Sequence, residues 1–239
     1  NGYSYQGKVA LFMALNKIEV LNEANEDLNE YFLELEWLED FSIKKNSEYI
    51  TIHQVKTYNT SAMSSYKEAI WTLLLKILEF TTLEKAYLHV TNGLNIPEDF
   101  LEKHGIKDPV NPVKNPRIKS PYESYKAVVD SGQYDSLVEK FELYNYGDQD
   151  NEIRFCSFDD IETKIKEKIL DFVGENASTE RIDRAYLCLL GLVDSNIKER
   201  HKDIQKGEKK EKVTINFVDI KEIVEHNHDL PSREYTIYY

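Results

Sequence analysis

An acid, an amide and a lysine stand in two neighbouring segments of the sequence, at positions where they could act together. Asp40 lies at the end of one predicted strand, and Gln54 and Lys56 lie two residues apart on the next. Pairing around a turn near Asn46 places Asp40 opposite Gln54, because antiparallel partners are equidistant from the turn. Side chains two apart share a strand face, so Lys56 lies beside Gln54, and Glu36 shares the face of Asp40.

These residue types suit metal-dependent phosphodiester cleavage. The Asp40 carboxylate, Oε1 of Gln54 and the carbonyl of Val55 are hard oxygen donors of the kind that Mg²⁺ prefers. Lys56 can orient the attacking water, help to remove its proton and offset charge on the transition state. The commoner use of such residues is a solvated cross-strand pair that stabilises little, and this alternative stays open. The apolar neighbours of Gln54 and Lys56 predict a buried strand, which favours the functional interpretation.

Periodicity predicts the elements that position these side chains. Helices are expected over residues 5–25 and 64–82, where apolar residues recur on one broad face. Strands are expected over 31–43, 49–58 and 86–91, with a polar turn at 44–47 that makes the first two a hairpin. The sequence therefore predicts an α/β fold whose core runs helix, β-hairpin, helix, strand.

The second half of the chain has a different texture. Five of the six prolines lie in residues 96–121, which we interpret as an irregular connection or insertion. The pattern beyond it predicts helices over 122–129, 136–144, 159–173, 180–201 and 219–225, and strands over 153–158 and 213–218. We therefore expect a catalytic core over 1–95, a connection over 96–121, and a helix-rich docking or oligomerisation region over 122–239.

Three motifs in order carry a resemblance to a known family. They are Gly-Tyr-x-Tyr-Gln at Gly2–Gln6, Glu-x-x-Glu-Asp at Glu36–Asp40, and Gln-x-Lys at Gln54–Lys56. The segment Gly2–Gly93 resembles the PD-(D/E)xK restriction-endonuclease-like superfamily. Within it, the chain is similar to nuclease domains of bacterial anti-phage effectors: the CD-NTase-associated double-strand DNA endonucleases, Lamassu-type nucleases and ABC-three-component proteins.

The resemblance implies a restriction-endonuclease-like core with a Mg²⁺ or Mn²⁺ cofactor. It implies metal binding by Asp40 and Gln54 and a catalytic role for Lys56. Glu39 competes with Asp40 for the acidic position, and strand alternation favours Asp40 unless a bulge intervenes. Gln6 matches a position where related enzymes carry a helix Glu, so this chain has one carboxylate fewer and a tight second metal is not expected.

Composition limits the partners. The 30 basic and 43 acidic residues give a net charge of -13, which argues against a general nucleic-acid coat protein and predicts weak unaided DNA binding. Cys156 and Cys188 are too few for a disulfide framework or a Cys-based zinc site, as in a cytoplasmic protein. No apolar run approaches the ~20 residues that span a bilayer, so no membrane segment is expected.

The leading hypothesis is a Mg²⁺-dependent DNA endonuclease that acts as an effector of anti-phage defence. Its substrate would be double-stranded DNA, and cleavage would depend on homo-oligomerisation or on a complex with an ATPase or sensor subunit. The alternative is a non-enzymatic assembly subunit that retains a degenerate nuclease fold. The neutral Gln6 and the acidic composition favour this alternative.

Overall fold

The computed structural model describes residues 2–94, 100–103, 105–109, 116–148, 150–206 and 213–226. Its helices are α1 (Gly2–Glu23), α2 (Lys67–Glu79), α3 (Phe100–Lys103), α4 (Pro116–Asp130), α5 (Tyr134–Val138), α6 (Phe158–Val173), α7 (Thr179–Lys206) and α8 (Phe217–Glu225). Its strands are β1 (Tyr31–Leu35), β2 (Phe41–Lys45), β3 (Glu48–Lys56), β4 (Lys85–Val90), β5 (Phe141–Leu143) and β6 (Val213–Asn216). The fold is mixed α/β, with a helix-rich C-terminal half.

A single six-stranded sheet runs through the protein in the order β5-β4-β3-β2-β1-β6. Strands β1, β2 and β3 are antiparallel neighbours, and β4 and β5 continue the sheet in parallel. Strand β6 pairs antiparallel with β1. The two edge strands therefore come from the C-terminal half. The sheet contains strands from both sides of the domain boundaries predicted after residues 95 and 121, and those boundaries remain predictions.

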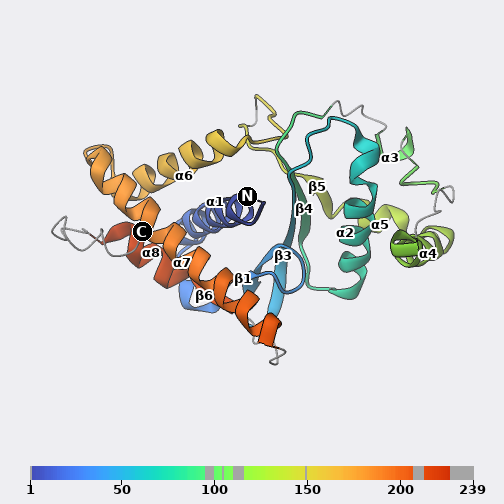
Figure 1. Cartoon of the computed structure of the whole chain (residues 1–239), viewed down its shortest axis with the longest axis horizontal. Helices are drawn as coiled ribbons and strands as arrows, with labels where there is room; N and C mark the ends of the chain where they lie inside the picture. The colour runs from blue at the N-terminus through green and yellow to red at the C-terminus, as the bar shows by residue number, and fades with distance from the viewer. Residues whose placement is uncertain are drawn as a thin grey trace.

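Helices cover both faces of this sheet (Figure 1). Helices α1, α6, α7 and α8 pack on one face around a core that includes Leu33 and Phe41. Helix α2 packs on the other face over Ile52 and Leu88, with α4 and α5 beside it. Successive strand residues point to opposite faces, which is why His53 and Gln54 belong to different sides of the molecule.

Helix α1 is more deeply buried than an amphipathic helix on one sheet face would be. Val9, Ala10 and Leu11 are consecutive and inaccessible to solvent, so every side of this stretch is covered. A helix that is apolar all round belongs in a core. Here the sheet covers one side, and α6, α7 and α8 cover the others.

The prediction of one strand over 31–43 is wrong, because this segment forms two strands. Strand β1 ends at Leu35, and Glu36 adopts a positive φ of 48° that reverses the chain. The Glu36 N–H donates to the Asp40 carbonyl oxygen at 2.9 Å and closes the turn. The predicted hairpin turn is confirmed, with Asn46 at a φ of 54° between β2 and β3.

Two other predicted elements are wrong. The helix expected over 136–144 ends at Val138, and Phe141–Leu143 forms strand β5. The strand expected over 153–158 is irregular, although the Cys156 N–H donates to the Val90 carbonyl oxygen at 3.0 Å. Pairing with β4 decided the first outcome, and local propensity did not.

The predicted connection at 96–121 falls partly outside the described residues. Within 96–121 the structure describes α3 and the start of α4, and it leaves out 96–99, 104 and 110–115. In the part of the chain that is described, no helix has the length and apolar content needed to span a bilayer.

Candidate functional site

Asp40 lies in the turn before β2 and reaches across to β3. Phe41 is paired with His53, so Asp40 is opposite Gln54, as the spacing predicts. The Asp40 Oδ2 accepts a hydrogen bond from the Val55 N–H at 2.5 Å. The carboxylate therefore continues the hydrogen bonding between β2 and β3 by one step beyond the Phe41–His53 pair. This bond fixes the Asp40 side chain against β3.

Gln54 and Lys56 lie on the face of β3 that α2 covers. In the amide orientation that satisfies both of its ends, the Gln54 nitrogen donates to the Ala69 carbonyl oxygen of α2 at 3.1 Å. Its oxygen then accepts from Nζ of Lys56 at 3.3 Å. Helix α2 thus orients Gln54 so that an acceptor oxygen faces the lysine.

Gln6 enters the site from the first turns of α1. Its Nε2 donates to the Asp40 carbonyl oxygen at 2.8 Å, and the side chain is buried. The same carbonyl accepts from the Glu36 N–H, so two donors hold the main chain of Asp40. The structure therefore brings Gln6 to the site through the backbone of the acidic residue.

Glu39 and Asp40 carry the most perturbed carboxyl groups of the site. Burial, together with the negative Asp40, raises the pKa of Glu39 to about 7, although Lys76 and Lys56 act to lower it. Burial also raises the pKa of Asp40, against the lowering effects of the Val55 N–H and of Lys56. Burial therefore disfavours the ionised form of both carboxyl groups.

Lys76 is the residue of this constellation that the sequence did not reveal. It lies on α2, forms an ion pair with Glu79 at 2.6 Å, and is close enough to Glu39 to lower the pKa of that carboxyl group. The signal was present, because Lys76 interrupts the apolar stretch of the predicted helix. Nothing in the sequence connected that interruption with residue 39.

Buried polar side chains continue along the same sheet face. The Tyr49 hydroxyl donates to Oε1 of Glu34 at 2.7 Å, and Nζ of Lys44 lies 3.5 Å from Oε2 of Glu34. Ser42 lies opposite Glu34 in the register, between Asp40 and Lys44, and is buried. These polar side chains are therefore enclosed, which places the candidate site at the end of a buried polar stripe.

The residues present fit a divalent metal ion in part. Among the described residues there is no group of three or more His, Cys, Asp or Glu side chains that could hold a metal. Magnesium commonly retains several waters and takes only one or two protein carboxylates. Asp40, with the amide oxygen of Gln54 and the carbonyl of Val55, meets that requirement. A cation there would also stabilise the ionised forms of two carboxyl groups whose pKa burial raises.

His53 lies on the opposite face of β3 in a series of buried polar contacts. Its Nδ1 is 3.0 Å from Nε2 of His89, and its Nε2 is 2.8 Å from the Thr51 hydroxyl. Nδ1 of His89 is 2.7 Å from the Tyr146 hydroxyl, and Phe41 stacks on His53 with ring centroids 4.2 Å apart. The partners are thus side chains, and both imidazoles are fully buried.

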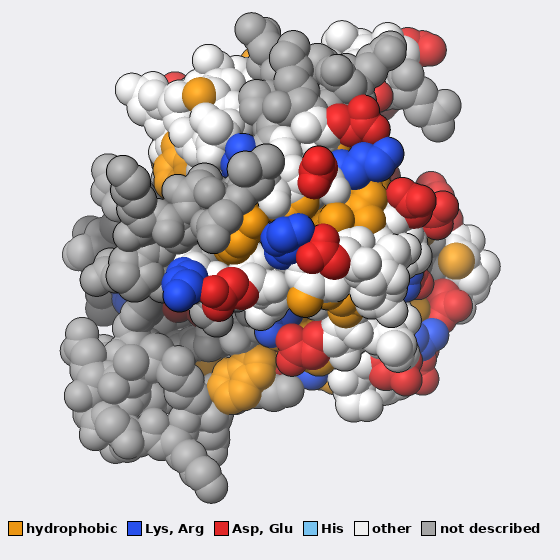
Figure 2. Space-filling model, turned by 90° about the vertical axis from the view of Figure 1, so that its right-hand side faces the viewer, with side chains coloured by type: hydrophobic (Ala, Val, Ile, Leu, Met, Phe, Trp, Pro, Cys, Tyr) orange, Lys and Arg blue, Asp and Glu red, His pale blue; other side chains and the backbone are white. Residues whose placement is uncertain are grey.

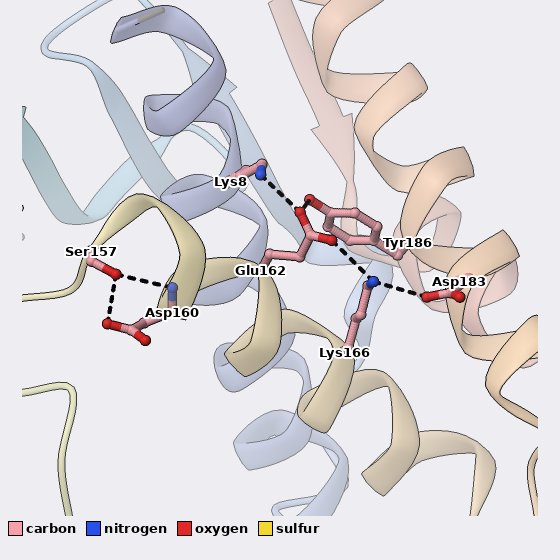
Figure 3. A network of polar contacts seen from close by, with 7 residues as sticks. All are labelled: Lys8, Ser157, Asp160, Glu162, Lys166, Asp183 and Tyr186. Atoms are coloured by element: carbon pink, nitrogen blue, oxygen red, sulfur yellow. Dashed lines mark hydrogen bonds and ion pairs between the residues drawn. The ribbon is translucent and has the colours of Figure 1, made fainter.

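The N-terminal end of α1 is also tied to the C-terminal helices (Figure 3). Glu162 of α6 accepts from Lys8 at 3.0 Å and from the Tyr186 hydroxyl at 2.8 Å, and Lys166 bridges Glu162 and Asp183. Partial burial raises the pKa of Glu162, but its bonds to Lys166, Tyr186 and Lys8 outweigh this and lower it to about 2. Lys8 is two residues from Gln6, so one helix end contacts both the site and the C-terminal half.

Residues 141–239 match the family model of C-terminal domain 1 of the ABC-three-component (ABC-3C) systems. The matched segment begins at β5 and includes α6, α7, β6 and α8. It supports the expected context of a multi-component anti-phage defence system. The nuclease resemblance of Gly2–Gly93 lies outside the matched segment. No curated protein and no solved structure matches the chain.

A cavity of about 540 Å³ lies away from Asp40 and Lys56, between α1, α6 and the segment after β5. Its lining includes Phe12, Tyr144 and Lys168. Lys168 is already paired with Glu19 at 2.7 Å and with Asp171 at 3.6 Å. The cavity shares no lining residue with the candidate site.

Proposed function

We propose that this chain is a metal-dependent DNA endonuclease that serves as an effector in an ABC-3C-type anti-phage system. The proposal rests on the contact between Asp40 and β3: the Asp40 carboxylate accepts a hydrogen bond from the Val55 N–H. The Gln54–Lys56 pair lies beside this contact. The order of α1, three antiparallel strands, α2 and parallel β4 agrees with the core that the family resemblance implies.

The residues divide the chemistry among them. Asp40 and the oxygen of Gln54 would hold Mg²⁺ or Mn²⁺, together with the Val55 carbonyl. Such an ion would supply charge stabilisation at the phosphate and a lower pKa for the attacking water. Lys56, held 3.3 Å from Gln54, orients that water and offsets negative charge as it develops. Gln6 keeps the main chain of Asp40 in place.

The substrate must be brought to the site by something other than a basic surface. On the face formed by α2 and α4, Lys and Arg side chains are interspersed with Asp and Glu side chains (Figure 2). With a net charge of -13, the chain gains little from phosphate contacts. We therefore expect cleavage of double-stranded DNA to require a second copy of the chain or an ATPase or sensor subunit, which the segment over 141–239 would bind.

Plasmid cleavage with Mg²⁺ and the other subunits of the system tests the proposal. Lys56→Ala and Asp40→Ala should each lower the cleavage rate by at least about 100-fold, since each removes a group that acts on the transition state. Lys85→Ala is the matched control, because Lys85 begins β4 at the opposite end of the sheet. Wild-type rates in both site variants would reject the assignment.

The second candidate is a non-enzymatic assembly subunit with a degenerate site. It is favoured by the hydrogen bond that already occupies the Asp40 carboxylate and by the absence of a three-ligand group among the described residues. Calorimetric titration with Mn²⁺ separates the candidates. Binding that Asp40→Ala abolishes supports the enzyme, whereas a chain that assembles with its partners and binds no Mn²⁺ supports the subunit.

A further inference from the structure

Four exposed aromatic side chains surround the end of the sheet that carries Asp40 and Lys56. They are Trp37, Tyr58, Phe155 and Phe158, and between 38% and 45% of each is accessible to solvent. They come from three separate places in the chain: the β1–β2 turn, the segment after β3, and the start of α6 with the residues just before it. The fold has therefore gathered them from distant parts of the sequence.

Hydrogen bonds and one packing contact place three of these residues, Trp37, Tyr58 and Phe155, beside the site. Lys56 and Val90 are paired at the ends of β3 and β4, and the Val90 carbonyl accepts from the Cys156 N–H at 3.0 Å. Phe155 precedes Cys156, and its ring lies 3.3 Å from the position that a Cβ would take on Gly93. Nδ2 of Asn92 donates to the Tyr58 carbonyl oxygen at 2.7 Å. Trp37 belongs to the turn that the Glu36–Asp40 hydrogen bond closes.

Two of the rings rest on buried tyrosines. Phe158 packs on Tyr5 with ring centroids 4.7 Å apart, and Tyr58 packs on Tyr66 with centroids 5.2 Å apart. Tyr5 and Tyr66 are inaccessible to solvent, and the Tyr5 hydroxyl is held by the Cys156 carbonyl at 2.6 Å. These two exposed rings are therefore each supported on one side, which reduces the entropy lost when a ligand stacks on the other.

The chemical type of these side chains favours one kind of ligand. Among the described residues, the other exposed large apolar side chains are aliphatic, and they lie on helices: Val20 on α1, Leu78 on α2 and Leu187 on α7. A protein-docking surface commonly mixes aliphatic and aromatic residues, whereas the large apolar side chains that are exposed at this end of the sheet are all aromatic. Exposed planar rings suit planar ligands.

We propose that Trp37, Tyr58, Phe155 and Phe158 form a stacking surface for unpaired bases of the nucleic-acid strand whose phosphate is cleaved at Asp40 and Lys56. This inference rests on the proposed nuclease function. Every base presents an aromatic face, so stacking gives affinity without sequence preference and without a basic surface. It suits a chain with a net charge of -13, which gains little from phosphates. Base faces are hidden inside a duplex, so the strand must be single-stranded, frayed or locally opened at the site.

The test is binding of a labelled 20-nucleotide single strand, and of its duplex, to the full chain with Ca²⁺ replacing Mg²⁺. We expect the single strand to bind at least about 10-fold more tightly than the duplex, since several bases contribute stacking. Tyr58→Leu and Phe158→Leu should each weaken binding of the single strand by about 5-fold or more. Val20→Ala and Leu187→Ala are the controls and should leave it unchanged. Unfolding temperatures of all four variants verify that each is folded.

Trp37 offers a second readout that does not depend on the leucine variants. The only other tryptophan, Trp71, is buried, so quenching of fluorescence by the single strand reports stacking on Trp37, and Trp37→Phe should abolish the quenching. Unchanged binding by the Tyr58→Leu and Phe158→Leu variants, or tighter binding of the duplex, overturns the stacking surface. The stacking surface is also rejected if these variants no longer bind a partner subunit but still bind the oligonucleotide.

The cleavage assay distinguishes the two proposals. Metal-dependent plasmid cleavage that needs Lys56, combined with single-strand binding that ignores the rings, rejects the stacking surface and leaves the nuclease proposal standing. Binding that depends on the rings, in a chain that cleaves nothing with any of its partners, supports the surface and rejects the nuclease proposal.

Discussion

His53 and His89 are buried in uncharged form one strand apart. Burial, with His89 adding to it, lowers the pKa of His53 well below its ordinary value, and burial lowers the pKa of His89 to about 3. If either imidazole were protonated, the cation would be without hydration by water, and it would also face the second imidazole at 3.0 Å. The pair therefore gives the fold a pH dependence.

We expect the histidine pair to lower the free energy of unfolding as the pH falls below about 6.5, in opposition to Glu39, whose raised pKa makes the folded state take up a proton in the same range. Both folded-state pKa values lie below the value of about 6.5 for unfolded histidine, so the unfolded chain binds more protons between that pH and about 3. Between pH 7.5 and 5.5 each histidine should cost about 1.4 kcal/mol. Urea unfolding at the two pH values measures this. The His53→Gln/His89→Gln double variant should lose most of the decrease, whereas the exposed His226→Gln control should keep it; equal slopes would contradict the prediction.

Gln6 is predicted to act on cleavage by positioning Asp40. Gln6→Leu removes one of the two donors to the Asp40 carbonyl and should cost about 1 kcal/mol of stability. If the proposed function holds, the variant should also cleave about 10-fold more slowly, because small displacements of catalytic groups are costly. Plasmid cleavage and urea unfolding measure the two effects. Lys17→Ala, on the same helix, is the control, and a stable variant with the wild-type rate would exclude a positioning role.

At the scale of elements, α1 lies close to α7, and Gly7 makes that approach possible. A Cβ at residue 7 would lie 2.9 Å from Cγ1 of Val193, too close for an undisturbed contact. Gly191 of α7 is also helical, but a Cβ there would meet nothing within 4 Å. The two glycines therefore form a matched pair, one with a packing role and one without.

We predict opposite effects of alanine at the two positions. Gly191→Ala should stabilise the protein by about 0.5–1 kcal/mol through helix propensity. Gly7→Ala gains the same propensity, but the displacement of Val193 should cost about 1–3 kcal/mol and make the net effect destabilising. Thermal unfolding should show a rise of the melting temperature for the first variant and a fall for the second. A rise in both would mean that α1 and α7 adjust freely.

At the scale of the whole molecule, the candidate catalytic core and the C-terminal half share one sheet and one hydrophobic core. Phe217, Ile220 and Val224 of α8 are fully buried in the same cluster as Leu11 of α1. Strand β6 closes the edge of β1. A chain without these elements would expose apolar surface of α1 and an unpaired strand edge, both of which promote aggregation.

We therefore expect a fragment of residues 1–95 to be unable to fold as a soluble monomer. A chain ended after residue 212 should fail in the same way, because it lacks β6 and α8. Size-exclusion chromatography and far-ultraviolet circular dichroism, with the full chain as reference, measure the outcome. A monomeric 1–95 fragment with cooperative unfolding would show that the expected catalytic core is an independent domain after all.

The sequence alone determined the arrangement that depends on neighbours along the chain. Strand alternation and the turn at Asn46 were enough to place Asp40 opposite Gln54, with Lys56 on the same face as Gln54, because these residues lie within one hairpin. The sharp turn at Glu36, which splits the predicted strand, was missed, since a single residue with positive φ leaves no periodic signal.

The tertiary structure decided what depends on distant segments. The bond from Gln6 to Asp40 spans 34 residues, and the pairing of β6 with β1 joins Val213 to Leu35. Lys76 reaches Glu39 only because α2 packs on the sheet. Whether a polar residue such as Glu34 is buried, and which aromatic rings meet at one end of the sheet, follows from the same long-range packing. Local propensity and periodicity carry no information on such contacts, because burial is a property of the assembled layers.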